Sequence, residues 1–320
     1  MTVRRYEDSR ELRTHPFKPT QEEFQFVYQN DREKAVTAAG TYLRSRLNGD
    51  MPLEMGPDAA LAYGKDRSIL SKEELCQRFG WEVEKPIACV MSHVFTDAVH
   101  RNNWLVFPDY LTWLRETLHA IRQIHDVNWL VKPHPSERWF RPQQTAEGEY
   151  LESAADCQHV RILPYDVNTA SVLNVAHAMV TCCGTSGIEF SCYGIPCVLA
   201  GEAPYSSLGF TLEPQSVEEY FALLSDISKV DFLDSSQIEK AKVLAFIYFR
   251  QQLVYSCLNP PMHLHPLNPD FDEDKFWQEA MHSVQQYRPE DDRYYQAQTA
   301  QVSQCPTHLV NPQWEFASGA

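Results

Sequence analysis

The most regular feature of the chain is a series of short, continuous apolar runs separated by longer amphipathic segments. Continuous apolar runs, as opposed to alternating ones, are typical of strands that are buried on both faces of a parallel sheet. Strands and helices that alternate at short intervals favour the same architecture. We therefore predict an α/β fold with parallel strands over residues 85–93, 127–133, 159–166, 178–183 and 195–201.

Between these runs, apolar residues recur at the spacing of a helix face. Leu111, Leu114 and Leu118 illustrate this spacing, and Ser71 with Glu74 forms the pattern of a capping box at a helix start. Helices alternating with buried strands are expected to cover both faces of the sheet. The predicted helices cover residues 31–48, 71–80, 108–125, two segments that begin near 169 and 186, 216–228, 235–256 and a segment that ends near 286.

The pattern divides the chain into three segments. Residues 1–80 are predicted to hold a polar, aperiodic arm up to about residue 30, then helices and a connector. Residues 81–256 hold the alternating strands and helices together with a long closing helix. Residues 257–320 hold a proline-rich segment, a terminal helix and a polar tail that we expect to be mobile.

The composition of the chain limits the kinds of partner that it can bind and the cellular compartment in which we expect it. Hydrophobic residues make up 43% of the 320 residues, which is enough for a sizeable core, and the net charge of -15 argues against nucleic acid as a partner. The chain has no run of roughly 18 apolar residues, so no membrane span is predicted. Its nine cysteines lie mostly in apolar runs, which favours reduced thiols in the cytoplasm.

Parallel sheets bind ligands at the carboxyl ends of their strands, so the loops that leave the predicted strands are the candidate sites. After the first strand, "SHVFTDAVH" supplies His93 and Asp97. A polar loop that closes a buried strand would explain these residues equally well. After the second strand, "KPHPSE" places His134 between two prolines and next to Lys132. Because a proline restricts the preceding residue to extended backbone, the ring of His134 is expected to be held in one direction.

The fourth strand leads into "CCGTSGIEF", a loop of small residues followed by a helix. The glycines allow a ligand to approach the backbone closely, and the hydroxyls and the helix start favour an anion. Glu189 in the first turn either complements the helix dipole or accepts a hydrogen bond from a sugar hydroxyl. The sequence is not a P-loop, and an ordinary helix N-cap is the alternative. The anion-binding residues predicted for this loop are Gly184, Thr185, Ser186 and Gly187.

Two further segments carry polar residues that could form a site. The loop "AGEAPYSSLGFT" follows the last strand and supplies Tyr205 and Ser206, although a plain strand–helix connection would look the same. The pair His263 and His265 has no third ligand at a convincing spacing, so we predict no metal site there.

Taken in order, the segments "KPHPSE", "YDVNT", "GTSGIEFSCYGIPCVLAG" and "YSSLGFT" resemble bacterial capsule polysaccharide biosynthesis proteins. The resemblance covers about residues 83–230 and corresponds to the C-terminal, nucleotide-binding half of these proteins. They are glycosyltransferases with two Rossmann-like domains (GT-B type), related to enzymes that transfer Kdo, sialyl or glycerophosphate groups. The resemblance implies a Rossmann-like sheet and a nucleotide-activated sugar as donor, with a glycan as acceptor.

The resemblance also implies roles for individual residues. His134, Thr185 and Ser186 would contact the donor phosphate, with Lys132 and the two loop glycines beside them, while Glu189, Tyr205 and Ser206 would face the nucleotide or sugar. The transfer would need neither a metal nor a cofactor. The catalytic base is the least defined role, and His93 or Asp97 would fill it.

The chain departs from the family pattern at its N-terminus. A GT-B enzyme usually has a complete N-terminal Rossmann domain, whereas only about 80 residues precede the recognisable half here. Three readings therefore stay open: a glycosyltransferase, a nucleotide-sugar epimerase, and a non-catalytic nucleotide- or glycan-binding module. A partner subunit that supplies an acceptor domain, and peripheral association with the inner face of the cytoplasmic membrane, also stay open.

Overall fold

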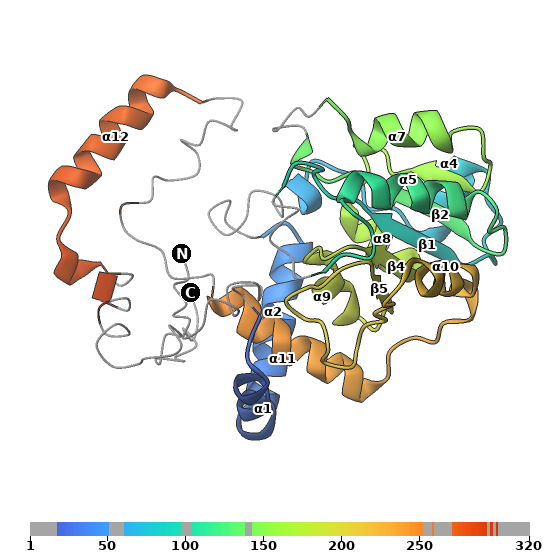
Figure 1. Ribbon diagram of the computed structural model, residues 1–320. Coiled ribbons are helices and arrows are strands. Elements are labelled where there is room, and N and C mark those ends of the chain that lie inside the picture. The colour runs from blue at the N-terminus through green and yellow to red at the C-terminus, as the bar shows by residue number, and fades with distance from the viewer. Residues whose placement is uncertain are drawn as a thin grey trace.

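A computed structural model describes residues 18–50, 61–97, 104–137, 143–251, 258, 271–292, 295–296 and 299 (Figure 1). Its centre is a five-stranded sheet in which every pairing is parallel. The strand order is β3-β2-β1-β4-β5, which is the order of a doubly wound Rossmann sheet. The predicted α/β class is thus confirmed. The strands are β1 (Ile87–Met91), β2 (Asn128–Lys132), β3 (Val160–Ile162), β4 (Ala176–Thr181) and β5 (Cys197–Leu199).

The continuous apolar runs are explained by two separate cores, one on each face of the sheet. Successive side chains of a strand point to opposite faces, so Cys89 belongs to one core and its neighbour Val90 to the other. Every residue of β1, β2 and β5 is buried. A strand that needs an apolar side chain on both faces has no position for a polar one, which is the pattern seen in the sequence.

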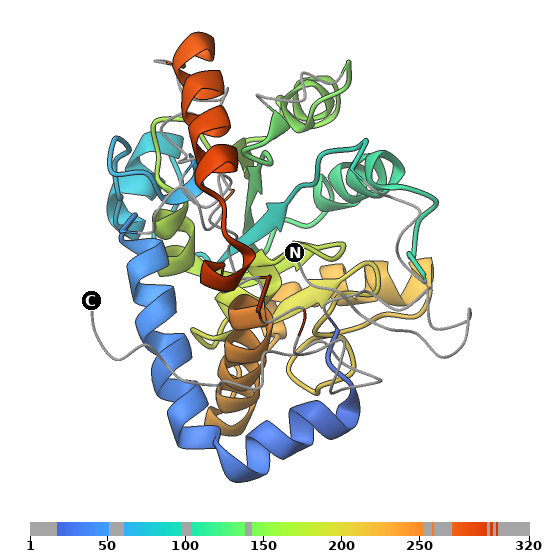
Figure 2. The ribbon, with the colours of Figure 1, turned by 90° about the vertical axis from the view of Figure 1, so that its left-hand side faces the viewer.

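Helices cover both faces of the sheet. One face packs against α5 (Tyr110–Ile121), α7 (Ala146–Ser153) and α10 (Val217–Ser225). The core on the opposite face is formed with side chains of the helices α1 (Gln21–Asn30), α2 (Arg32–Leu47), α4 (Lys72–Phe79), α8 (Thr169–Val175), α9 (Ser186–Ser191) and α11 (Ser235–Gln251). Figure 2 shows α11, in orange, running beside α2, in blue. The 3-10 helix η4 (Ile227–Lys229) follows α10 and buries Ile227 in the same core, whereas α12 (Glu273–Gln286) and the 3-10 helix η6 (Pro289–Asp291) lie outside these layers.

The helix starts follow local chemistry that the sequence displays. The Ser71 hydroxyl accepts a hydrogen bond from the backbone of Glu74 and the Glu74 carboxylate accepts one from Ser71, so the predicted capping box is confirmed. Gly80 ends that helix in the left-handed conformation, with φ 68. These caps satisfy backbone groups that the first and last turns leave unpaired.

Two helices were not expected from the sequence. The region assigned to an aperiodic arm contains α1, which a capping box between Thr20 and Glu23 starts and which buries Phe24 and Val27. Phe26, on the opposite face, is exposed and obscures the helical period. The second is α7, whose first turn contains Gly148, a poor helix former. Its buried apolar side chains are few, so its periodicity is weak.

Candidate site at the carboxyl edge of the sheet

The loops predicted to carry chemistry meet at one edge of the sheet. β1 lies between β2 and β4, so the loops that follow these three strands leave the sheet side by side. From β1 the strand order continues in one direction to β2 and β3. After β3 the chain returns to the other side of β1, where β4 and then β5 extend the sheet in the opposite direction. Ligands of doubly wound sheets bind at this reversal of strand order. The sequence could not supply the strand order, and therefore could not show that these loops are neighbours.

His93, two residues beyond β1, is packed into the floor of this edge. Its ring stacks on Tyr110 with centroids 4.4 Å apart, and Nε2 lies 3.0 Å from the hydroxyl oxygen of Thr181. That hydroxyl donates to the carbonyl of Met91, so it accepts from Nε2 of His93. The amide of Cys183 also points at Nε2, at 3.4 Å, which would require the opposite tautomer. The shorter contact favours a proton on Nε2.

The environment of His93 keeps its ring neutral. Burial, followed by the nearby His134, lowers the pKa of His93 to about 3. A group with so low a pKa is a weak base near neutral pH. Asp97 is exposed, and its carboxylate makes no hydrogen bond with any residue that the structure describes. Within the same described ranges, no hydrogen bond links Asp97 to His93. The role predicted for these two residues stays a prediction.

His134 is half-buried and has one ring nitrogen engaged. The amide of Ser136 donates to its Nδ1 at 3.2 Å, which places the ring proton on Nε2. Nε2 makes no hydrogen bond within the described part of the chain. Burial, followed by the charge of Lys132, lowers the pKa of His134 to about 4. His134 therefore presents a neutral N–H donor, held in place by the loop's own backbone.

Lys132 and Glu137 flank His134 and are both buried. Only 8% of Lys132 is exposed, and its ammonium donates to the carbonyl of Pro133. The carboxylate of Glu137 accepts from the amide of Ala146 at the start of α7, at 3.0 Å. Burial raises the pKa of Glu137 to about 7, although the Ala146 amide and Lys132 oppose this shift. Sequence reasoning missed Glu137, because a carboxylate at the end of "KPHPSE" looks like a surface residue.

Close packing explains the glycines of the loop after β4. A Cβ on Gly184 would lie 3.1 Å from the Thr181 hydroxyl and 3.5 Å from the His93 ring. A Cβ on Gly187 would lie 2.0 Å from the hydroxyl of Tyr205, a distance that no real side chain tolerates. Gly184 thus lets the loop approach His93, and Gly187 lets it approach Tyr205. The hydroxyls of Thr185 and Ser186, both half-buried, make no hydrogen bond with a described residue.

The residues predicted in the loop after β5 support the β4 loop from behind. Tyr205 is fully buried, and its hydroxyl donates to the carbonyl of Gly184 at 2.5 Å. Ser206 is also buried and accepts from the amide of Ala203 at 2.9 Å. In the structure both side chains are engaged with backbone of their own protein. Their predicted contact with a nucleotide or sugar stays a prediction.

Glu189, in the first turn of α9, is turned towards the N-terminal helices. Its Oε1 accepts from Nε of Arg46 at 2.6 Å, and its Oε2 accepts from the hydroxyl of Tyr63. The carboxylate is thus engaged at both oxygens by residues that lie more than a hundred positions earlier in the chain. Sequence reasoning missed Arg46 and Tyr63, because nothing in their local pattern indicates the distant partner.

The residues that the structure describes contain neither a metal-binding cluster nor a membrane-spanning helix. They contain no group of three or more His, Cys, Asp or Glu side chains arranged to hold a metal ion. None of their helices has both the length and the apolar character needed to cross a membrane. The histidines His263 and His265 lie outside the described ranges.

The part of the chain that holds the site matches a known family of proteins. Residues 84–226 match the family model described as capsule polysaccharide biosynthesis protein, which confirms the resemblance noted in the sequence. That region spans β1 to α10 and contains all three site loops. A search of curated proteins found no match.

The solved structures that are similar to this chain include two with low sequence identity. The β-Kdo 2,4 transferase KpsC of Thermosulfurimonas dismutans has 14% identity and a TM-score of 0.41, and the match covers 66% of this chain and 55% of that one. The glycotransferase of kitacinnamycin has 15% identity and a TM-score of 0.33, with 72% of this chain and 62% of that one covered. The chain thus matches only part of each of these proteins.

Proposed function

We propose, from the match of residues 84–226 to the capsule polysaccharide biosynthesis protein model, that the protein is a glycosyltransferase that uses a nucleotide-activated sugar. It would be of the GT-B type, and its donor phosphate would bind at the carboxyl edge between β2, β1 and β4. The observation that carries the proposal is that the His134 loop and the Thr185–Ser186 loop leave the sheet at the same edge, on the two sides of β1 and of His93.

The chemistry of these groups suits a phosphate. His134 offers Nε2–H as a donor, and the two hydroxyls of the β4 loop offer two more. When the bond between sugar and phosphate breaks, negative charge develops on the nucleotide. Donors fixed in advance stabilise that charge without reorganising. A neutral histidine that approaches a phosphate also has its pKa raised, so it can take up a proton as the charge develops.

The acceptor needs a base, and the two candidates differ. His93 is a weak base because its pKa is about 3, and its ring is stacked on Tyr110. Asp97 is exposed at the same edge. We therefore favour Asp97 as the base and regard His93 as the residue that supports the β4 loop. Asp97→Asn should abolish transfer while leaving nucleotide binding intact, whereas loss of binding would contradict this assignment.

A non-catalytic binding module is the second candidate. It is favoured by one observation: within the described residues there is a single sheet, and no second Rossmann sheet faces the site. This reading predicts that nucleotide binds without sugar release or transfer. A partner subunit that supplies the acceptor side would restore turnover.

The test is thermal stabilisation by CMP, CDP, UDP and GDP. A ligand that binds the native state raises its stability by mass action, so about 3 kcal/mol is expected when the ligand is at a hundred times its Kd. His134→Ala and Ser186→Ala should reduce the shift, and Ser225→Ala, at an exposed serine of α10 outside the candidate loops, should not. If no nucleotide stabilises the wild type, the proposal is wrong. Turnover of the corresponding nucleotide sugars with and without acceptor then separates the two candidates.

A further inference from the structure

A buried charge cluster joins the N-terminal segment to the helix behind the β4 loop. Arg46 comes from α2, Tyr63 from the segment that follows, and Glu189 from α9. The Arg46–Glu189 pair is almost entirely buried, with side-chain exposures of 10% and 4%. The guanidinium of Arg46 also lies over the ring of Phe249 in α11, 5.2 Å from its centroid. The cluster therefore fixes α9 to two neighbouring helices at once.

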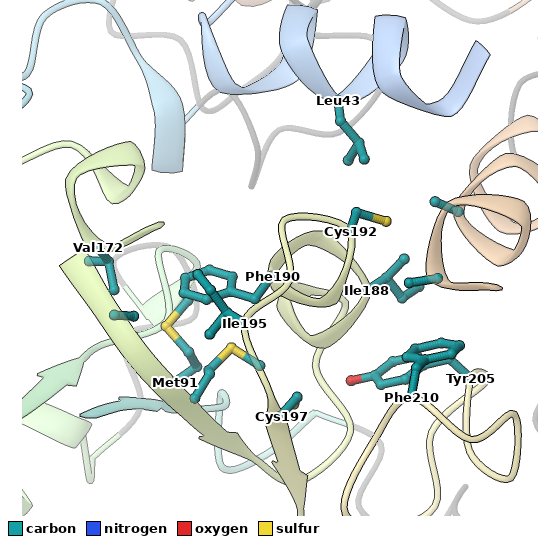
Figure 3. Packing of buried hydrophobic residues seen from close by; sticks show 14 of the residues in the cluster. Leu43, Met91, Val172, Ile188, Phe190, Cys192, Ile195, Cys197, Tyr205 and Phe210 are labelled. Atoms are coloured by element: carbon teal, nitrogen blue, oxygen red, sulfur yellow. The ribbon is translucent and has the colours of Figure 1, made fainter. Parts of the chain in front are cut away.

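The cluster bears on the proposed donor site because α9 carries the β4 loop at its start. Figure 3 shows α9, with Ile188, Phe190 and Cys192, between the sheet and α2. The helix has only six residues, and the Thr185–Ser186 turn begins it. Thr185 makes no side-chain cap. A short helix without a cap contributes little stability of its own, so its position depends on its packing and its buried partners.

The electrostatics of the cluster require all three groups. Burial alone lowers the pKa of Arg46, but the carboxylate of Glu189 reverses this effect and holds the pKa above its ordinary value. Burial, followed by the charge of Glu189, raises the pKa of Tyr63 well above its ordinary range. Tyr63 thus stays a neutral hydrogen-bond donor. Removing one member leaves a buried charge or donor without its partner, which is more costly than removing the whole pair.

We infer that Arg46 and Tyr63 are positioning residues for the proposed donor site, acting through Glu189 to hold the Gly184–Gly187 turn. Both residues lie outside residues 84–226, so side chains of the N-terminal segment support the site from outside the region that matches the family model. The effect on nucleotide binding rests on the proposed function, whereas the effect on the turn itself does not. Because its two oxygens are engaged by Arg46 and Tyr63, we expect Glu189 to act by positioning the turn and not by contacting a ligand.

The test separates positioning from stability. Arg46→Met alone leaves the buried Glu189 carboxylate without its counter-charge, and should lower the melting temperature by on the order of 10 °C. The double variant Arg46→Met/Glu189→Met replaces the pair with apolar side chains and should recover most of that loss, because only the neutral Tyr63 hydroxyl is left without its acceptor. The matched control is Arg32→Met/Glu239→Met, which removes an exposed Arg–Glu pair between the same helix α2 and α11.

Two readouts are measured on the full chain. Hydrogen exchange of the Gly187 amide, which donates to the carbonyl of Gly184 at 3.0 Å, reports on the turn without any ligand. The affinity for whichever of CMP, CDP, UDP or GDP stabilises the wild type reports on the site. In the double variant we expect at least tenfold faster exchange and at least tenfold weaker binding, while the control matches the wild type in both.

Each outcome decides the inference. Wild-type exchange in the recovered double variant overturns it, and weaker binding with unchanged exchange would make Glu189 a direct ligand contact. If no nucleotide binds the wild type, the proposed function fails, and exchange alone still decides whether the cluster holds the turn. If the double variant does not fold, Tyr63→Phe, which removes one hydroxyl, is expected to speed exchange of the Gly187 amide. Unchanged exchange in that variant overturns the inference.

Discussion

The two loops proposed to bind phosphate are stabilised in opposite ways. The β2 loop holds His134 by local means: prolines on both sides and a hydrogen bond from the amide two residues later. The β4 loop contains no proline and depends on side chains from elsewhere, including the hydroxyl of Tyr205 on the Gly184 carbonyl. A locally fixed loop can be read from its own sequence, whereas a loop held by distant residues cannot. The two should also respond differently to mutation.

The largest effect is expected at the closest contact of the β4 loop. Gly187→Ala would place a Cβ at 2.0 Å from the Tyr205 hydroxyl and at 2.6 Å from the ring carbon that bears it. We expect a loss of about 3 kcal/mol in the free energy of unfolding, since crowding a packed interior costs roughly this much. Urea unfolding measures it.

Gly40→Ala in α2 is the control for that measurement. Its new Cβ would meet only the end of the Arg44 side chain, at 3.5 Å. Alanine is the better helix former, so this variant should gain about 1 kcal/mol. A Gly187→Ala protein as stable as the wild type would show that the turn is not tightly held.

The burial of His134 in the β2 loop should make the stability of the folded protein depend on pH. The pKa of His134 is about 4 in the folded protein, below the ordinary value of 6.5. Between these two values the unfolded chain binds a proton that the native state does not, so His134 costs nothing above about pH 6.5 and lowers stability as the pH falls towards 4. Between pH 7 and pH 5 the wild type should therefore lose about 2 kcal/mol more than His134→Gln.

The comparison with His134→Gln isolates this group from its neighbours. His93 shifts in the same direction, and Glu137, with a pKa of about 7, shifts in the opposite one, but both are present in the two proteins. Equal losses in wild type and variant would mean that His134 is not buried as the structure has it. Saturating nucleotide should reduce the difference, because a bound phosphate raises the pKa of the histidine.

The same contrast explains which features of the fold and the site could be predicted from the sequence and which could not. The five strands, the capping box at Ser71 and the candidate loops follow from patterns within a few residues. The strand order does not, because it depends on crossovers that no local pattern encodes. The partners of Glu189 and Gly184 were missed for the same reason, since Arg46 and Tyr205 lie far from them in the chain. Glu137 was missed because its burial depends on α7, a helix whose weak periodicity hid it.

A smaller effect is expected from the hydrogen bond that supports the β4 loop. Tyr205→Phe leaves the packing of the ring but removes the donor to the Gly184 carbonyl. A loss of about 1 kcal/mol is expected for one hydrogen bond. Nucleotide binding should weaken as well, because the turn loses a contact that fixes its position. Calorimetric unfolding and a binding titration measure the two effects, and Tyr193→Phe, at an exposed tyrosine, is the control.

The smallest effect on stability is expected from changing Pro135, one of the two prolines that restrict the backbone of the β2 loop. Pro135→Ala gives the unfolded chain more freedom and should cost about 0.5 kcal/mol or a little more. It also releases the backbone of His134 from its restriction to extended conformations. Nucleotide affinity should therefore fall by a larger factor than the stability loss suggests, whereas Pro289→Ala, outside the sheet, should leave affinity unchanged. If Pro135→Ala lowers stability and affinity no more than Pro289→Ala does, the prolines do not orient His134, and the amide of Ser136 alone holds the ring.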